Sequence, residues 1–449
     1  MSSIVAERRE PQLGNIKELA QIMKRERGEN ASVFSRIIFF IGAGCSVSAG
    51  VPTVTEIAQD RTIYLAKKYL RKDSSDAAEA YNALVHARQF SFGSSDTAAG
   101  TPVGDQTSAE INWGNVYDHI FESHIRSPPE IRDYFGGLCH PEKIRLNWSH
   151  LCLGEMVRQR HISTIITTNF DQLVLSGLVQ AGILPSVTDG VESLNRVDAS
   201  LRYPQVIELH GSRHTYALRN ARNDVAAVMH DPGAVSTLHA LYDNSRLFVV
   251  VGYAGREVGV MDLLISAGKF YPDHEVVWVA HSDDPAKLGD KAFSFLATSK
   301  HGRLIAGMDS DFFFLELCRE LEVGAPRALL EPLATLGDLL ENIAAHENPE
   351  ISTEIERARA MLISLQKAQA DYLDKFSETD KLLKKCQEAM LAGDYKKVYE
   401  LLDPAAVQLD DPDLWQLLGD AAIQLGRDSP DQTFLRRSVE AYKKAARHE

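Results

Sequence analysis

The sequence has few cysteines, no long apolar run and no excess of positive charge. Its five cysteines are far apart, and no two of them form a Cys-x-x-Cys pair. Sparse, unpaired cysteines are typical of a reducing compartment. The longest uncharged run begins at Ile37 but is interrupted by glycine and serine. It is therefore too polar to supply the roughly 20 apolar residues of a membrane span. With a polar N-terminus unlike a signal peptide, these features predict a cytoplasmic protein with no membrane segment.

Acidic residues outnumber basic ones. The chain of 449 residues has 62 Asp and Glu against 48 Lys and Arg, a net charge of -14. Because neutralising a phosphate backbone requires a surplus of basic side chains, direct binding of nucleic acid is not expected. The short basic segment 24–27 is interpreted as the solvated face of a helix.

Short apolar runs alternate with helical patterns through the first 325 residues. Strands are expected at 37–41, 163–167, 247–251 and 275–279, and more weakly at 205–209 and 303–306. Helices are expected at 12–27, 148–160 and 259–270. Such alternation predicts an α/β fold with a Rossmann-like, doubly wound parallel sheet.

Two regions depart from this alternation. A helical stretch at 62–88 is followed by a segment rich in Gly, Ser and Thr at 89–112, which indicates a helical and loop insertion over about residues 60–145. From residue 326 strand patterns disappear and helices follow one another. The sequence therefore predicts two domains, residues 1–325 and 326–449.

The C-terminal region carries a faint repeat. Trp415-Gln416-Leu417-Leu418-Gly419 matches the opening of a tetratricopeptide unit, and Gly393 and Gly426 lie 33 positions apart, close to the usual period of about 34. The region is interpreted as tetratricopeptide-like, with an undifferentiated helical bundle as the alternative.

The first motif with chemical content is a glycine loop, which follows the expected strand at 37–41. It reads Gly42-Ala43-Gly44-Cys45-Ser46. Glycines let a backbone approach a pyrophosphate, whose charge is bound by N–H groups of the next helix. The usual dinucleotide motif would place a third glycine at position 47, where this chain has Val47.

Three further motifs follow other expected strands. They are Thr167-Thr168-Asn169-Phe170-Asp171, Glu208-Leu209-His210-Gly211-Ser212 and Gly252-Tyr253-Ala254-Gly255 with the following Arg256-Glu257. Ligands of open α/β sheets bind at the carboxyl ends of the strands. The polar side chains of these motifs are therefore expected at one site.

In this order the four motifs resemble the sirtuin family, over about residues 35–314. The resemblance implies a domain that binds NAD and cleaves its nicotinamide–ribose bond. Asn169 and His210 would be the catalytic residues. The residues that would bind NAD are Gly42, Ala43, Gly44 and Ser46 in the glycine loop, Asp171 at the nicotinamide, and Gly252 and Ala254 at the adenosine half.

The sequence also departs from the sirtuins that deacylate proteins. Those enzymes carry zinc on two Cys-x-x-Cys pairs, which are absent here, so no metal is expected. Their Asp-Phe-Arg after the glycine loop is also missing. Thr53 and Glu56 occupy this region instead, and their spacing predicts a capping box at the start of a helix.

The combination resembles zinc-free bacterial sirtuin-like effectors of anti-phage defence. It implies an NAD glycohydrolase that takes NAD as its substrate and depletes it when triggered. One alternative is an NAD-dependent protein deacylase or ADP-ribosyl transferase, and another is a non-catalytic sensor of NAD or ADP-ribose. The C-terminal helices would serve assembly into a homo-oligomer or the binding of a protein partner or phage-derived trigger.

Overall fold

The computed structural model describes residues 12–28, 34–90, 107, 111–125, 127–212, 232–255, 258–324, 326–344, 348–373, 377–391, 393–409, 411–427 and 432–446. The chain divides into two compact units. The first comprises residues 1–179 and 183–314, and the second residues 180–182 and 315–449. The boundary predicted after residue 325 stays a prediction.

The first unit is built on a sheet that has eight strands in the described part of the chain, all parallel to their neighbours. The strands are β1 (Gln12–Leu13), β2 (Ile37–Ile41), β3 (Thr164–Thr167), β4 (Ser186–Asp189), β5 (Gln205–Glu208), β6 (Leu247–Val251), β7 (Glu275–Val279) and β8 (His301–Ile305). Their order is β1-β8-β7-β6-β2-β3-β5-β4. This order confirms the predicted doubly wound α/β fold.

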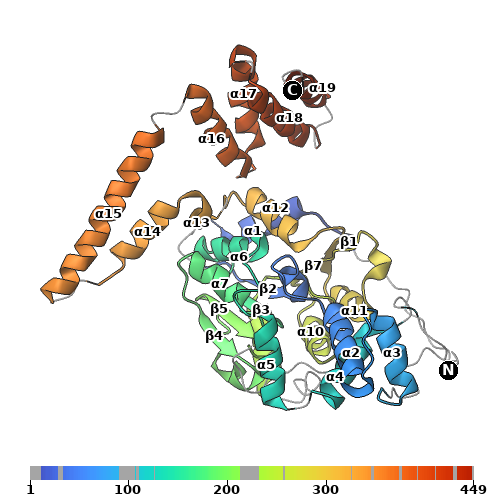
Figure 1. The fold of residues 1–449 in the computed structure, drawn as a ribbon. Helices are drawn as coiled ribbons and strands as arrows, with labels where there is room; N and C mark the ends of the chain where they lie inside the picture. Colours follow the sequence, from blue (N-terminus) through green and yellow to red (C-terminus); the bar gives the residue numbers. More distant parts are fainter. Residues whose placement is uncertain are drawn as a thin grey trace. The chain divides into compact units, whose positions relative to one another are not determined.

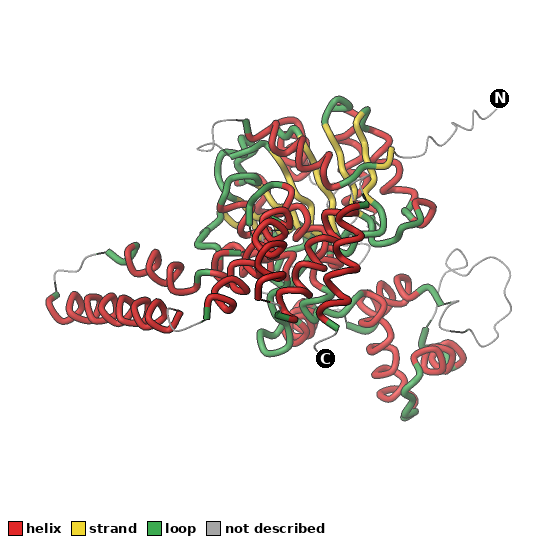
Figure 2. The backbone as a smooth tube through the Cα atoms, turned by 90° about the horizontal axis from the view of Figure 1, so that it is seen from above, coloured by secondary structure: helices red, strands yellow, loops and turns green. Residues whose placement is uncertain are grey.

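The sheet is apolar on both faces at its centre. Every residue of β2 and β6 is buried, as expected for parallel strands covered by helices on each side. Figures 1 and 2 show these helices around the strands. They are α1 (Ile16–Arg27), α6 (Trp148–Arg158), α7 (Leu173–Gln180), α9 (Pro232–Asn244), α10 (Val258–Phe270), α11 (Asp290–Thr298) and α12 (Ser310–Glu320).

The N-terminal helix begins later than predicted. Residues 12–13 form β1 and pair with β8, and α1 starts at Ile16. The side chain of Asn15 accepts a hydrogen bond from the backbone N–H of Glu18, which caps the helix and fixes its start. A second strand, β4, lies where no strand was expected.

In its described residues, the insertion after β2 contains α2 (Val54–Leu70), α3 (Ala77–His86), α4 (Trp113–Ser123) and α5 (Pro128–Leu138). Most of the loop predicted at 89–112 lies outside the described residues. The predicted capping box is confirmed, because Thr53 and Glu56 exchange hydrogen bonds at the start of α2. The single helical stretch predicted at 62–88 is wrong. The chain leaves α2 at Arg71, which has a left-handed backbone with φ of 53°, and α3 begins with its own cap at Asp76.

The second unit is helical, as predicted. Its helices are α13 (Arg327–Leu330), α14 (Pro332–Glu341), α15 (Pro349–Leu373), α16 (Glu378–Leu391), α17 (Tyr395–Leu409), α18 (Pro412–Arg427) and α19 (Thr433–Ala445). Trp415 is buried in an apolar cluster of α16 to α19. Gly419 packs against Tyr442, where a Cβ would lie 2.8 Å from the ring. The tetratricopeptide assignment stays a prediction.

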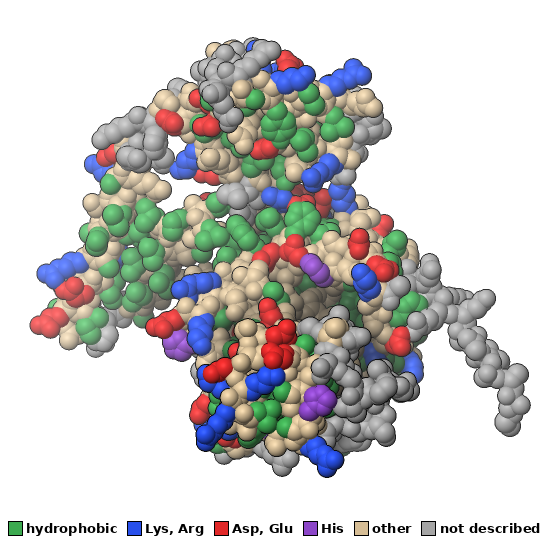
Figure 3. All heavy atoms as spheres, turned by 45° about the vertical axis from the view of Figure 1, so that its right-hand side comes forward, with side chains coloured by type: hydrophobic (Ala, Val, Ile, Leu, Met, Phe, Trp, Pro, Cys, Tyr) green, Lys and Arg blue, Asp and Glu red, His purple; other side chains and the backbone are tan. Residues whose placement is uncertain are grey.

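None of the described helices is long and apolar enough to cross a membrane. On the face of the molecule seen in Figure 3, Lys and Arg side chains are interspersed with Asp and Glu side chains.

Candidate functional site

The four sequence motifs follow four strands that are neighbours in the sheet. In the order β6-β2-β3-β5, each strand pairs with the next in parallel. Their carboxyl ends therefore share one edge of the sheet. The loops that begin at Gly42, Thr168, Leu209 and Gly252 consequently lie next to each other, as predicted from the motifs.

The glycine loop packs directly against the loop after β6. Gly42 N–H donates to Val251 O at 3.0 Å, and Gly44 N–H donates to Gly252 O at 2.7 Å. A Cβ at Gly42 would lie 2.6 Å from Gly252 O, and one at Gly252 would lie 2.6 Å from the backbone nitrogen of Cys45. The packing of the two loops therefore requires glycine at 42 and 252, whether or not a phosphate binds there.

The glycine loop presents a mixed surface. A short 3-10 helix, η1, runs over Ala43–Ser46. Ala43 and Gly44 are exposed, whereas Cys45 and Ser46 are buried. In the second loop Ala254 is exposed. The positions predicted to hold the pyrophosphate are thus accessible at Ala43 and Gly44.

Asn169 joins the end of β3 to the glycine loop. Its side-chain Nδ2 donates to Gly42 O at 3.2 Å and to Ser46 Oγ at 3.1 Å. Its backbone N–H donates to Thr167 Oγ1. The side chain is 6% exposed, and within the described residues its Oδ1 accepts no hydrogen bond. A buried amide oxygen without a donor is available to a ligand or a water molecule.

Asp171 follows in a tight turn. Its Oδ1 accepts a hydrogen bond from Leu173 N–H at 2.9 Å, which caps the start of α7. The next residue, Gln172, has a left-handed backbone with φ of 58°. Asp171 is buried at 5% exposure. The residue predicted to contact nicotinamide, Asp171, therefore has one carboxylate oxygen already bonded to a backbone N–H.

His210 is the second residue after the end of β5. It is 3% exposed, and its ring centroid is 6.2 Å from that of Phe170. The next residue, Gly211, has a positive φ of 78°, which turns the chain away from the strand. His210 is thus brought to the β3 turn that contains Asn169 and Asp171.

Glu208 is a functional candidate that the sequence reasoning left without a role. It is the last residue of β5, 2% exposed, and in register with Thr167 on one side and Asp189 on the other. Burial, together with the negative charges of Asp189 and Asp171, raises the pKa of Glu208 to about 8. Its place in the Glu-Leu-His-Gly motif was visible, but β4 was not expected, so the neighbouring Asp189 could not be foreseen.

The cysteines form no metal site in the described residues. All five are buried and free of disulfides, and no group of three or more His, Cys, Asp or Glu side chains that could hold a metal ion occurs in this part of the chain. Burial raises the pKa of the Cys45 thiol, and Cys45 Sγ contacts Val251 O at 3.5 Å. The absence of bound metal in the protein itself stays a prediction.

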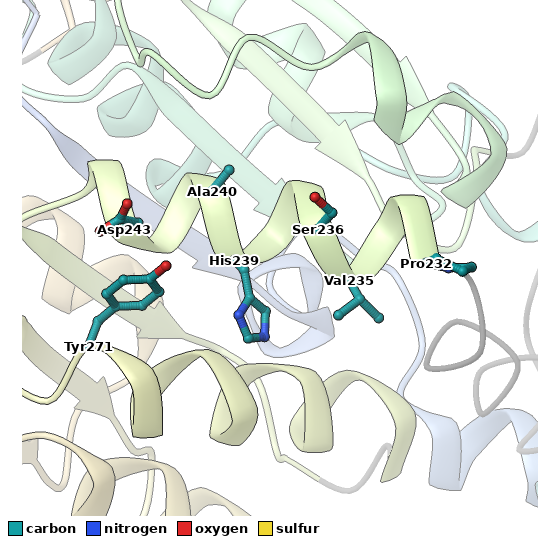
Figure 4. Close-up of a pocket in the computed structure, with 7 residues that line it drawn as sticks. All are labelled: Pro232, Val235, Ser236, His239, Ala240, Asp243 and Tyr271. Carbon is teal, nitrogen blue, oxygen red and sulfur yellow. The ribbon is translucent and has the colours of Figure 1, made fainter.

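A separate hollow of about 570 Å³ lies between α9 and the end of α10. Figure 4 shows His239 and Val235 on the side of α9 that faces α10, with Tyr271 next to Asp243. The residues that line this hollow do not include any of the predicted site residues.

Residues 163–301 match the family model described as the SIR2-like domain. Over this segment, the match supports the resemblance to the sirtuin family that the motifs indicate. Three of the four motifs, with Asn169, His210 and Gly252, fall within the matched segment. The glycine loop precedes this segment in sequence, and the sheet places it beside β3 and β6.

Solved structures that match this chain include several Sir2 proteins. Sir2Tm bound to a propionylated peptide is 15% identical, covering 69% of this chain and 100% of that chain with a TM-score of 0.36. A Sir2–p53 peptide–NAD⁺ complex is also 15% identical, covering 68% and 98%, with a TM-score of 0.33. No curated protein matches the sequence significantly.

Proposed function

We propose that the SIR2-like domain is an NAD glycohydrolase. The observation that carries the proposal is the position of Asn169. Its amide is bonded to the glycine loop through Gly42 and Ser46, and its Oδ1 accepts no hydrogen bond from the described residues. His210 follows β5, the strand that pairs directly with β3, on the same edge of the sheet.

The proposed reaction consumes one water molecule for each NAD⁺. Water attacks the carbon of the ribose that carries nicotinamide, and the glycosidic C–N bond breaks with its electron pair going to nicotinamide. The products are nicotinamide, ADP-ribose and a proton, or a cyclised ADP-ribose if a group of the adenine replaces water. Because nicotinamide leaves from a cationic ring, the reaction does not require a strong acid.

In this proposal Asn169 Oδ1 orients the ribose or the attacking water. His210 accepts the proton, because an imidazole exchanges protons near neutral pH. The carboxylate of Asp171 would stabilise the positive charge that develops on the ribose. These roles agree with the burial of Asn169, Asp171 and His210, which keeps bulk water from competing.

The glycine loop and the loop after β6 would hold the rest of the dinucleotide. The backbone at Ala43 and Gly44 is exposed and would receive the pyrophosphate, with Ser46 at the adjoining ribose. Gly252 and Ala254 would lie along the adenosine half. Asp171 would contact the nicotinamide amide with the oxygen that does not cap α7.

We extend the proposal to the cellular role. An enzyme that depletes NAD requires control, and the second, helical unit offers surfaces for a homo-oligomer, a protein partner or a phage-derived trigger. The chain would then act in the cytoplasm as an effector of anti-phage defence, without a metal cofactor.

One experiment separates this function from its alternatives. Purified protein is incubated with NAD⁺, with and without an acylated peptide, and nicotinamide and ADP-ribose are measured by chromatography. Release of nicotinamide without peptide supports the glycohydrolase. Release that requires the peptide indicates a deacylase, and binding of NAD⁺ without release indicates a sensor.

A further inference from the structure

A second asparagine holds the glycine loop from α6. Asn147 is the N-cap of α6 and is 8% exposed. Its Nδ2 donates to Cys45 O at 2.7 Å and to Ser48 Oγ at 2.7 Å. Asn169, from the end of β3, is bonded to Gly42 and Ser46 of the same loop. The two asparagines therefore bind interleaved positions of one short segment.

The orientation of the Asn147 amide is determined by its partners. A backbone carbonyl can only accept, so the nitrogen must face Cys45 O. The oxygen then faces His150 Nδ1 at 2.5 Å, and this nitrogen must carry the proton. His150 is fully buried, and burial lowers its pKa, which favours the neutral ring. His150 thus fixes the amide in the direction in which it binds the loop.

A relay of hydrogen bonds extends from Asn147 to the start of α12. Ser48 Oγ accepts from Asn147 and donates to Asp311 Oδ2 at 2.6 Å. Asp311 Oδ1 accepts from the backbone N–H of Ser149 at 2.7 Å and from its hydroxyl at 2.5 Å. The carboxylate therefore ties the loop to the first turn of α6.

We propose that Asn147 is a positioning residue that holds the glycine loop in the conformation that Asn169 needs, with Ser48 and Asp311 completing the hold. Asn147 does not need to touch the substrate. It fixes Cys45 O, which lies between the two loop residues bonded to Asn169. Its effect on nicotinamide release rests on the proposed function, whereas its effect on the loop does not.

The substitution Asn147→Asp separates this role from helix capping. Aspartate caps a helix as well as asparagine does, and its carboxylate still accepts from His150, but it cannot donate to Cys45 O. The matched control is Asn15→Asp, the same change at the N-cap of α1, where the side chain is bonded to Glu18 N–H. In the full-length protein, we expect Asn147→Asp to lower kcat for nicotinamide release by about tenfold to a hundredfold through misplacement of Asn169. Asn15→Asp should leave kcat unchanged.

Hydrogen exchange provides a readout that is independent of activity. Amides of residues 44–51, among them Gly44, Ala49 and Val51, which are bonded to backbone oxygens, should exchange at least about tenfold faster in Asn147→Asp than in the wild type. Ser48→Ala is the second variant, because Ser48 is exposed and its loss leaves the Asn147 cap of α6 in place. It should show the same changes at smaller size.

The outcomes distinguish the two proposals. Wild-type exchange and wild-type release in both Asn147→Asp and Ser48→Ala would overturn the positioning role. Faster exchange in the variants of a protein whose wild type releases no nicotinamide would support the hold on the loop and reject the glycohydrolase. Faster exchange with unchanged kcat in an active enzyme would show that the loop does not position Asn169.

Discussion

Glu208 and Asp189 are register partners at the carboxyl ends of β5 and β4. Asp189 is satisfied, since its oxygens accept from the backbone N–H and the hydroxyl of Ser212 at 2.7 and 3.0 Å. Glu208 Oε2 accepts no hydrogen bond from the described residues. The two carboxyl groups therefore have unequal environments. Asp189 has hydrogen-bond donors for its charge, whereas Glu208 is buried beside that charge and keeps its proton up to higher pH.

This inequality predicts a pH dependence of stability. Because the pKa of Glu208 is raised to about 8, the folded protein retains a proton that the unfolded chain releases near pH 4.5. The free energy of unfolding should fall as the pH rises between these values, by at most about 1.4 kcal/mol per pH unit. Glu208→Gln should remove this slope in urea titrations at pH 5 to 8. Glu142→Gln, at an exposed position, is the control, and an unaltered slope in Glu208→Gln would contradict the assignment.

Gly252→Ala should destabilise the protein by more than about 3 kcal/mol. The new Cβ would lie 2.6 Å from the nitrogen of Cys45, and the residue has a φ of +66°, so both backbone strain and a backbone clash arise. Gly182→Ala is the matched control, because Gly182 has a φ of +76° and no atom within 4 Å of the added Cβ. It should cost only about 1 kcal/mol. Equal unfolding midpoints in urea for the two variants would refute the packing role of Gly252.

His210→Ala and Asn169→Ala should each lower nicotinamide release by roughly 10²-fold or more, because each removes a group assigned to proton transfer or ribose orientation. Circular dichroism should show cooperative unfolding for both. His239→Ala, in the hollow beside α10, is the histidine control and should release nicotinamide normally. Near-normal turnover in His210→Ala or Asn169→Ala would reject that residue's assignment.

Purified protein should contain no stoichiometric zinc. The five cysteines are buried and, in the described part of the chain, do not join other ligands in a group suited to a metal. Elemental analysis by mass spectrometry checks this expectation. About one zinc per chain would revive the deacylase alternative.

A protein that ends at residue 325 should still bind NAD⁺, because every predicted pocket residue precedes that point. Its hydrolysis should no longer respond to whatever activates the full-length chain. Calorimetric titration with NAD⁺ tests the binding. Nicotinamide release over a range of protein concentrations, compared with the full-length chain, tests the loss of activation. If the shortened protein loses NAD⁺ binding, the boundary after residue 325 is wrong.

The central strands could be predicted because they are apolar on both faces. The runs at Ile37–Ile41 and Leu247–Val251 consist only of apolar residues, which in an alternating α/β pattern is typical of a strand buried on both faces. Strand β4 could not be recognised, because Ser186–Asp189 is short, polar and partly exposed. Its identity as a strand depends on pairing with β5, a contact that no local pattern reveals.

The site was predictable in its motifs but not in its supporting contacts. Asn169 and His210 stand at strand ends, and the parallel sheet brings such ends to one edge. The raised pKa of Glu208 depends on its burial and on the charges of Asp189 and Asp171, which are distant in sequence. The hold of Asn147 on Cys45 O likewise joins residues 102 positions apart. Both are properties of the folded chain.

The interlocked glycines at 42 and 252 have a consequence for tracing ancestry. Since each is needed where two backbones touch, a related protein that had lost catalytic activity would still retain them for folding. The glycine loop therefore indicates a shared fold and does not by itself indicate a shared activity. A change at Asn169 or His210 that left the glycines intact would identify a lineage that had kept the scaffold and abandoned the reaction.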